Sequence, residues 1–317
     1  MTQYERYSTP QQDDEIDLRE LFATLWAGKW FVLACTLVFA AGGVAYALYK
    51  PNIYQANVLL APANEEAGVR GLSGQLGGLA SLAGISLGSG GSNQTKIALE
   101  VLQSRAFLTS FIRRHNLEIP LMGIKAWDVK SKDWIYNTEV YDPETGEWLK
   151  NEDGESYKPT DWDLVKVFKT AHLSVSENKD SGMVTISVKN QSPPAAARWA
   201  EWLVADINEH MRRKEVAEAE ARIAYLEAKL SETRIAGMQQ VFYQLIESET
   251  RTVMLANAQQ EYVFETVDPA VVPQEKSSPR RALIVILATM LGGMLGVFLV
   301  FVRAFLKLDS TEVKEQE

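Results

Sequence analysis

Two long stretches without a charged residue, one near each end of the chain, limit its possible folds more than any other feature. The first covers residues 30–49 and the second covers 282–302, so they are 20 and 21 residues long. As helices that rise about 1.5 Å per residue, each would cross the hydrocarbon layer of a bilayer, which is roughly 30 Å thick. Neither stretch has the polar face that a helix of this length needs in a soluble protein. We therefore predict two transmembrane helices.

A cleaved signal peptide is the alternative for the first stretch, because Ala45-Tyr46-Ala47 resembles a cleavage site. The 29 residues before the stretch hold six acids and three bases, however, whereas a signal peptide begins with a basic segment. Aromatic residues at the ends of the stretch, such as Trp30 and Tyr49, also suit a membrane–water interface. An uncleaved span is the favoured interpretation.

Two spans place both tails on one side of the membrane and everything between them on the other. Charge gives no clear orientation, but the tails are too short to fold, so the working part is the intervening segment. The predicted fold is an α+β domain outside the cytoplasm with one very long projecting helix, between two transmembrane helices. The predicted layout is a cytoplasmic tail 1–29, a span 30–49, the α+β domain 50–281, a span 282–302 and a cytoplasmic tail 303–317.

Composition and motifs exclude several classes of protein. A net charge of −9 argues against a nucleic-acid-binding protein, which needs a basic surface. One cysteine and three scattered histidines make a zinc site improbable. The sequence has no nucleotide-binding loop and no hydrolase or metalloprotease motif. We therefore predict no catalytic residue, metal or cofactor, and we expect a protein that is not an enzyme.

The intervening segment contains several short elements with readable patterns. Strands are predicted over 53–60 and 262–267, which should pair because both flank the spans, and over 171–176 and 183–189, which should form a hairpin. A helix is predicted over 95–115, and the aromatic-rich segment 120–165 should contain two short strands around a turn at 142–146. Residues 67–93 hold nine glycines and five serines, which is typical of a loop.

The longest predicted element is a helix over about 193–257. Ser192 can accept a hydrogen bond as its N-cap, and Pro193 suits the first turn. Unbroken, it would be roughly 95–100 Å long, so it must project from a domain of this size. Its apolar stripe, which includes Ile223, Leu226 and Leu230, should meet another copy in a coiled-coil homo-oligomer. The rival is a folded-back helical hairpin, with the bend expected at Gly237.

Small residues recur four apart in both spans. Gly292 and Gly296 form a GxxxG pair, and Gly43 and Ala47 form a weaker pair of the same kind. Such pairs let two helix backbones approach closely in lipid. They predict a contact between the spans or with a membrane partner, although small residues also occur in apolar stretches without such a role.

A proline-rich segment leads into the second span and carries a family resemblance. The Wzz-type polysaccharide co-polymerases, the chain-length determinants of bacterial O-antigen, have the pattern P-x2-P-x4-S-P-K-x11-G-x3-G. Here the second proline, the serine-proline pair and the two glycines fall at the same spacing. Two positions differ, since an arginine replaces the lysine and the first proline lies one residue early. The matching residues are Pro269, Pro273, Ser278, Pro279, Arg280, Gly292 and Gly296.

The resemblance to this family implies an inner-membrane protein with a periplasmic domain that forms a ring-like homo-oligomer. It implies a protein that acts with the membrane polymerase of lipid-linked repeat units and sets product length, with the growing polysaccharide as a further expected partner. Some relatives carry or pair with a cytoplasmic tyrosine kinase. Because 15 residues follow the second span, this chain resembles the kinase-free class.

The prolines of segment 268–281 also have a direct physical effect. Pro269, Pro273 and Pro279 each fix φ and remove a hydrogen-bond donor, so they favour a stiff, non-helical strut. Such a strut would transmit the position of the soluble domain to the spans. The alternative is a simple helix stop before the membrane.

The favoured interpretation of the whole chain is thus a non-enzymatic, oligomeric regulator of polysaccharide length. One alternative is a two-span sensor or adaptor that binds a periplasmic ligand and signals inward. Another is a membrane-anchored, sugar-acting enzyme that uses the aromatic and acidic residues of 120–165, for which no motif gives support.

Overall fold

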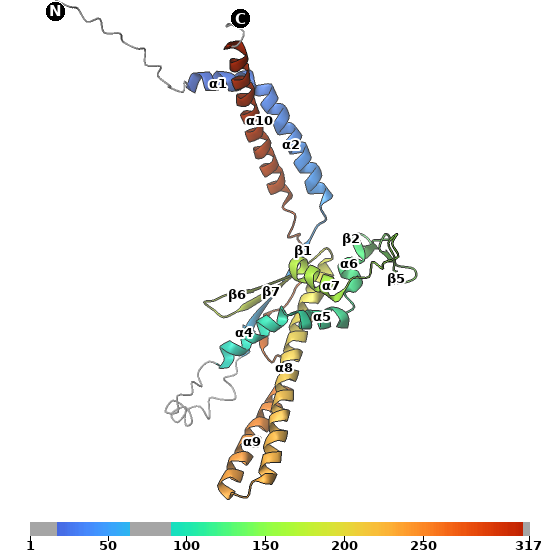
Figure 1. Ribbon diagram of the computed structural model, residues 1–317, viewed down its shortest axis with the longest axis vertical. Helices are drawn as coiled ribbons and strands as arrows, with labels where there is room; N and C mark the ends of the chain where they lie inside the picture. The colour runs from blue at the N-terminus through green and yellow to red at the C-terminus, as the bar shows by residue number, and fades with distance from the viewer. Residues whose placement is uncertain (1–17, 64–89, 313–317) are drawn as a thin grey trace, which may run out of the picture. The chain divides into compact units, whose positions relative to one another are not determined.

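The computed structural model describes residues 18–63 and 90–312. It divides into two compact units, one made of both ends of the chain, up to Pro51 and from Ser278, and one formed by Asn52–Ser277 (Figure 1). Most of the glycine- and serine-rich segment 67–93 lies outside the described residues.

The first unit contains the two uncharged stretches, and both are helices long and apolar enough to cross a membrane, as predicted. Its helices are α1 (Leu18–Ala27), α2 (Lys29–Tyr49) and α10 (Arg281–Glu312). The helices α2 and α10 pack against each other along their length in antiparallel directions, since Gly43 lies by Ala288 and Val32 by Gly296. Most of their apolar side chains remain exposed, which suits lipid-facing helices.

A four-stranded antiparallel sheet forms the centre of the second unit, in the order β6-β7-β1-β8. Its strands are β1 (Tyr54–Pro62), β6 (Leu173–Glu177), β7 (Val184–Asn190) and β8 (Phe264–Asp268). The pairing of β1 with β8 and the β6–β7 hairpin confirm the two strand pairings predicted from the sequence.

The core of this unit lies between the sheet and the first half of the long helix. Trp199, Leu203 and Ile207 of α8 (Pro193–Glu232) are buried, as are Val58 of β1 and Ile186 of β7, and all belong to one cluster. Helices α4 (Gly90–Leu102), α5 (Arg105–Arg114), α6 (Glu118–Met122) and α7 (Asp161–Val167), with the short π-helical turn η1 (Phe168–His172), supply further members. The single helix predicted over 95–115 is therefore wrong, because Ser104 caps a new helix there by accepting a hydrogen bond from Phe107 N.

The aromatic-rich segment forms two small hairpins: β2 (Ile124–Asp128) with β3 (Asp133–Tyr136), and β4 (Tyr141–Asp142) with β5 (Glu147–Trp148). The predicted turn at 142–146 joins β4 to β5 and includes Gly146 at a φ of 73°, where a side chain would be strained. The aromatic rings pack on one another, as in the edge-on pairs Trp127–Trp134 and Tyr141–Trp148. They form a local core of their own.

The prediction of one unbroken helix over about 193–257 is wrong. Helix α8 starts at Pro193 with Ser192 Oγ as its cap, as predicted, but it ends at Glu232, and α9 (Ala236–Ala258) runs back along it. Figure 1 shows this hairpin extending beyond the sheet. The folded-back alternative therefore holds, and α8 alone, with 40 residues or about 60 Å, is the long projecting helix.

The break falls at residues 233–235, and Gly237 lies inside the first turn of α9. Two of the three residues in the break, Thr233 and Ile235, are β-branched, and such residues lose side-chain freedom in a helix. The side chain of Gln239 donates a hydrogen bond to the Thr233 carbonyl at 2.8 Å, which satisfies an acceptor that the end of α8 leaves open.

Candidate functional site

The small residues of the two spans meet at the contact between α2 and α10. A Cβ atom added to Gly43 would lie 2.6 Å from Cβ of Ala288, and one added to Gly292 would lie 2.5 Å from Cβ of Phe39. At Gly296 the corresponding atom would be 3.0 Å from Cα of Val32. Ala47 is also buried. These four predicted residues thus lie where the backbones of the spans approach, and a role in binding a membrane partner stays a prediction.

Sequence reasoning missed two further features of the span pair. Gly28 separates α1 from α2, and a Cβ there would be 2.6 Å from the side chain of Val300, so a larger residue at this position would displace Val300. Arg281 Nε donates a hydrogen bond to the carbonyl of Ala47 at 3.1 Å, which satisfies an acceptor near the end of α2. The glycine between two helical patterns was the available signal for the first feature.

The predicted proline-rich strut runs between β8 and α10 without helix or strand over 269–277. Pro269 is exposed, Pro273 and Pro279 are half-buried, and Arg280 is exposed. Near its end, Ser277 N donates to the Ile53 carbonyl at 2.8 Å, and the bond between Ser278 and Pro279 is cis. The non-helical conformation agrees with the sequence, whereas the transmission of position to the spans stays a prediction.

The predicted oligomer stripe on α8 lies on the part of the helix that α9 accompanies. Ile223, Leu226 and Leu230 are half-buried in a single chain. Between the two helices, Ala219 of α8 is fully buried, and Arg222 Nε donates to Glu249 Oε2 of α9 at 2.9 Å. Part of the stripe is therefore used within the chain, and its contact with another copy stays a prediction.

A second apolar surface, which was not among the predicted sites, lies along one flank of α9. Met238, Val241, Leu245 and Leu255 share this side at helical spacing, and each is more than two-fifths exposed. Only three of the 23 residues of α9 are charged. We call these four residues the α9 flank. An exposed apolar surface on a soluble helix is typical of an interaction site.

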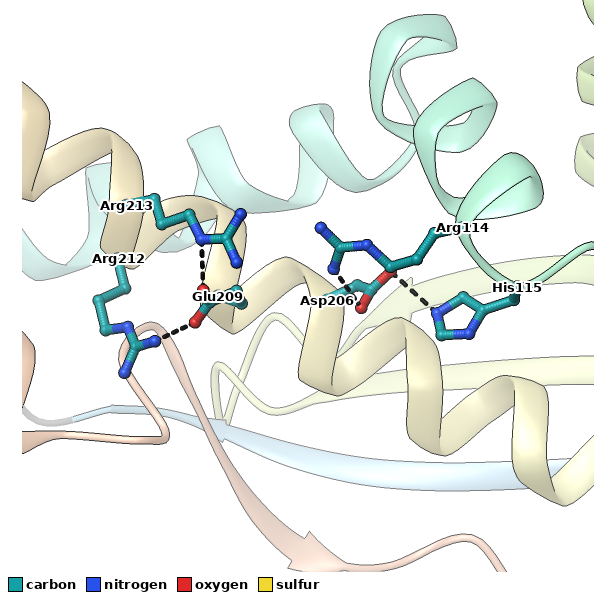
Figure 2. A network of polar contacts seen from close by, with 6 residues as sticks. All are labelled: Arg114, His115, Asp206, Glu209, Arg212 and Arg213. Carbon is teal, nitrogen blue, oxygen red and sulfur yellow. Dashed lines mark hydrogen bonds and ion pairs between the residues drawn. The ribbon is translucent and has the colours of Figure 1, made fainter.

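A network of charged side chains joins α5 to α8 (Figure 2). Asp206 accepts hydrogen bonds from Arg114 Nη1 at 2.9 Å and from His115 Nε2 at 3.1 Å. One turn further along α8, Glu209 accepts from both Arg212 and Arg213. Sequence reasoning missed the network; its signal was the pair of basic runs at 113–115 and 212–214, with Asp206 and Glu209 shortly before the second run.

The charges of the network shift two pKa values. Burial raises the pKa of Glu209, but hydrogen bonds and charge from Arg213 and Arg212 outweigh it and hold the pKa below its ordinary value. The pKa of His210 is lowered, first by burial and then by the positive charges of Lys214, Arg114 and Arg213. His210 is therefore neutral near pH 7, in surroundings where positive charge is in excess.

No group of three or more histidine, cysteine, aspartate or glutamate side chains is arranged to hold a metal ion within residues 18–63 and 90–312. His172 lies against Phe168 and Trp199, and its Nδ1 donates to the Lys189 carbonyl at 2.7 Å. His115 stacks on Trp202, with ring centroids 4.2 Å apart. These histidines pack and form hydrogen bonds within the fold.

Comparison with curated proteins gives relatives that are much longer than this chain. The chain is 29% identical over 129 residues to tyrosine-protein kinase etk of Escherichia coli, in several strains. The match covers 40% of this chain but 16% of the kinase. The whole activity of that protein therefore does not carry over to this one.

Comparison with solved structures gives two polysaccharide co-polymerases among its matches. A full-length bacterial polysaccharide co-polymerase is 14% identical, with a TM-score of 0.38 over 92% of this chain and 98% of the other. A fragment of WzzB, a polysaccharide co-polymerase from Salmonella Typhimurium, is 11% identical, with a TM-score of 0.35 over 72% and 100% of the two chains. At these TM-scores neither likeness establishes fold or function here.

Two family models match separate parts of the sequence. The model described as G-rich domain on putative tyrosine kinase matches residues 234–305, which include α9, the proline-rich strut and the whole second span. The model described as Wzz, chain length determinant protein, matches residues 14–115, which include the first span and the start of the soluble domain. The kinase-free assignment stays a prediction. The resemblance to the chain length determinant family that was inferred from the proline–glycine spacing is confirmed by the Wzz match over residues 14–115.

Proposed function

We propose that this protein regulates the length of a bacterial surface polysaccharide, as a non-enzymatic, oligomeric protein of the inner membrane. The observation that carries the proposal is the Wzz match over residues 14–115. It spans α2, β1, α4 and α5 and so joins the membrane anchor to the soluble core. O-antigen is the product that the family resemblance suggests.

The two span-length helices and the folded unit between them support the proposed topology. Unit Asn52–Ser277 would lie in the periplasm, with both tails in the cytoplasm. From there it could meet the growing polysaccharide, while the outer faces of α2 and α10 could meet the membrane polymerase. Both helices expose apolar side chains to such a partner or to lipid.

The α9 flank supports the proposed homo-oligomer. Its four apolar side chains lie on a helix in the soluble unit, where lipid does not cover them, and a repeat of the same chain would remove them from water. We take a second copy as the occupant because the family resemblance implies rings of identical subunits. The half-buried stripe of Ile223, Leu226 and Leu230 would extend this contact.

The first experiment tests the function through polysaccharide length. Deleting the gene should change the modal length of the surface polysaccharide on a gel, and the intact gene should restore it. Gly296→Leu should shift the modal length because it forces α2 and α10 apart, whereas Gly293→Leu should change it less, since a Cβ there meets nothing closer than 3.7 Å. An unchanged ladder after deletion would refute the proposal.

The second experiment tests the oligomer. Leu245→Glu combined with Leu255→Glu places two charges on the α9 flank and should reduce the mass of the detergent-solubilised complex. Tyr243→Glu is the control, because Tyr243 is also an exposed apolar residue, at 62% against 45% for Leu245 and 44% for Leu255, but lies on the other flank of α9. Equal masses for both variants would show that the α9 flank is not the subunit contact.

A second candidate function is a sensor or adaptor that works with a cytoplasmic tyrosine kinase. The observation in its favour is the match to etk, together with the G-rich domain model over 234–305. Affinity purification of the full chain from its own cells separates the two candidates. Recovery of a tyrosine kinase without a polymerase, together with an unaltered polysaccharide ladder in the deletion strain, would favour the adaptor.

A further inference from the structure

A cleft of about 320 Å³ lies between α5 and α8, next to the charged network. One side is apolar, formed by Phe107 and Phe111, and the ring of His210 meets Phe107 edge-on with centroids 5.7 Å apart. The volume is at the small end of the range for ligand sites, which suits one compact ring-sized group. The residues that line it are Phe107, Ser110, Phe111, Arg114, Asp206, Glu209, His210, Arg213 and Lys214.

Positive charge is in excess around this cleft, although the chain as a whole carries −9. Three cationic side chains line it, Arg114, Arg213 and Lys214, against the two carboxylates Asp206 and Glu209. Each carboxylate already accepts hydrogen bonds from two basic residues, Asp206 from Arg114 and His115, and Glu209 from Arg212 and Arg213. The carboxylates are thus occupied, and the surrounding positive charge is only partly balanced.

The two guanidinium groups keep donors for a ligand. Arg114 uses Nη1 in its bond to Asp206, and Arg213 uses Nε in its bond to Glu209. A guanidinium has five N–H donors, so each group retains N–H bonds that can reach an oxyanion. Figure 2 shows the two guanidinium groups pointing toward one another between α5 and α8. Two like charges that face each other in a cleft favour an anion between them.

We propose that this cleft binds an oxyanion carried on a ring-sized body, such as the carboxylate of a sugar acid or the phosphate of a sugar phosphate. Arg114, Arg213 and Lys214 would hold the anion, and Phe107 would contact the apolar face of the ring. Neutral His210 would add a hydrogen bond. The inference stands apart from the proposed function, because it rests on this cleft alone and would hold for a regulator or an adaptor.

The test uses the full chain in detergent micelles, with three probes: galacturonate, glucose 1-phosphate and glucose. Calorimetric titration should show saturable binding of at least one acid and none of neutral glucose. Arg213→Gln should weaken that binding about tenfold, because a hydrogen bond to a charged group is lost. Arg212→Gln is the matched control, since Arg212 bonds the same carboxylate but does not line the cleft.

A second measurement, by NMR, does not depend on the heat of binding that calorimetry detects. The bound anion should raise the pKa of His210, because a negative charge favours the protonated ring, and NMR titration of the ring protons would detect the change. Lys214→Gln provides a second variant should Arg213→Gln lower the unfolding midpoint. Binding of only one acid would identify the anion as carboxylate or phosphate.

Three results would overturn the proposal: glucose that binds as well as the acids, acids that bind equally to wild type, Arg213→Gln and Lys214→Gln, or no saturable binding of either acid. None of these would alter the polysaccharide ladder of the deletion strain, so failure here is separate from failure of the proposed function.

Discussion

The α2–α10 pair and the α8–α9 hairpin are both antiparallel helix pairs within one chain, but they use their residues in opposite ways. In the spans, glycines lie at the contact and bulky apolar side chains such as Phe298 and Met294 are exposed. In the hairpin, the contact includes the buried residues Ala219 and Ala256 and an ion pair between Arg222 and Glu249. The difference follows from the solvent that each pair is built for.

Because of this contrast, an exposed apolar residue has a different meaning in the spans and in the hairpin. In lipid, burying an apolar side chain between helices brings little gain, so association depends on close backbone approach. In water, an exposed apolar side chain is unfavourable unless something covers it. The exposure of Phe298 on α10 is therefore ordinary, whereas the exposure of Leu245 on α9 supports the proposed contact with a second copy.

The largest loss of stability is expected at Asn208, which acts through directed hydrogen bonds and not through contacts between paired helices. Asn208 of α8 is buried; its Oδ1 accepts from Val263 N and Phe264 N, and its Nδ2 donates to the Phe264 carbonyl. Asn208→Ala leaves three backbone groups unsatisfied and should lower the free energy of unfolding by about 3 kcal/mol or more. Urea denaturation would measure it, and a loss below that of an exposed substitution such as Glu201→Ala would contradict the role.

The next largest loss of stability is expected from a bulky side chain placed at the contact between the two spans. Gly43→Leu pushes a side chain into Ala288 and should destabilise the pair by about 1–3 kcal/mol, whereas Gly42→Leu meets nothing within 4 Å. The measurement uses Gly296→Cys, whose Cβ would lie 3.3 Å from Cβ of Cys35, close to the separation in a disulfide. In this background, Gly43→Leu should lower the yield of the disulfide between Cys35 and the cysteine at position 296, and Gly42→Leu should not. Equal yields would mean that the glycines are not needed for packing.

A pH effect of intermediate size is expected at His172. Burial lowers its pKa, and the hydrogen bond to the Lys189 carbonyl offsets this only in part. Above the ordinary pKa of 6.5, the ring is neutral in both states and has no effect. As the pH falls below that value, the unfolded chain binds a proton that the folded chain does not, so stability falls by up to about 1.4 kcal/mol per pH unit. His172→Phe should flatten this slope in denaturation curves, and an unchanged slope would contradict the assignment.

The smallest effect is expected at the ion pair of the hairpin. Arg222 and Glu249 are both partly exposed, so Glu249→Gln should lower stability by about 1 kcal/mol at most. The loss should shrink further in high salt, because salt screens exposed charges. Glu247→Gln, at the paired but more exposed Glu247–Arg251 contact within α9, serves as the reference. A loss of stability as large as that from Gly43→Leu would contradict this ranking of the hairpin ion pair below the packing of the spans.

The sequence predicted the features that depend on composition and local pattern. The spans, the β1–β8 and β6–β7 pairings, and the Ser192 cap all follow from charge-free length, alternation and capping chemistry. The break of the long helix was not predictable in this way, because Thr233 and Ile235 are only weak helix formers and the reversal is stabilised by residues such as Glu249 that lie far along the chain. The network around Asp206 also joins residues about 90 positions apart, and no local pattern records such a pairing.

The most direct test of the account is the mass of the detergent-solubilised full-length protein. The account predicts a complex of several identical chains, which Leu245→Glu with Leu255→Glu reduces toward single chains while the Cys35 link to Gly296→Cys still forms within each chain. A wild-type protein that is a monomer would contradict it, because the α9 flank would then have no second copy to cover it.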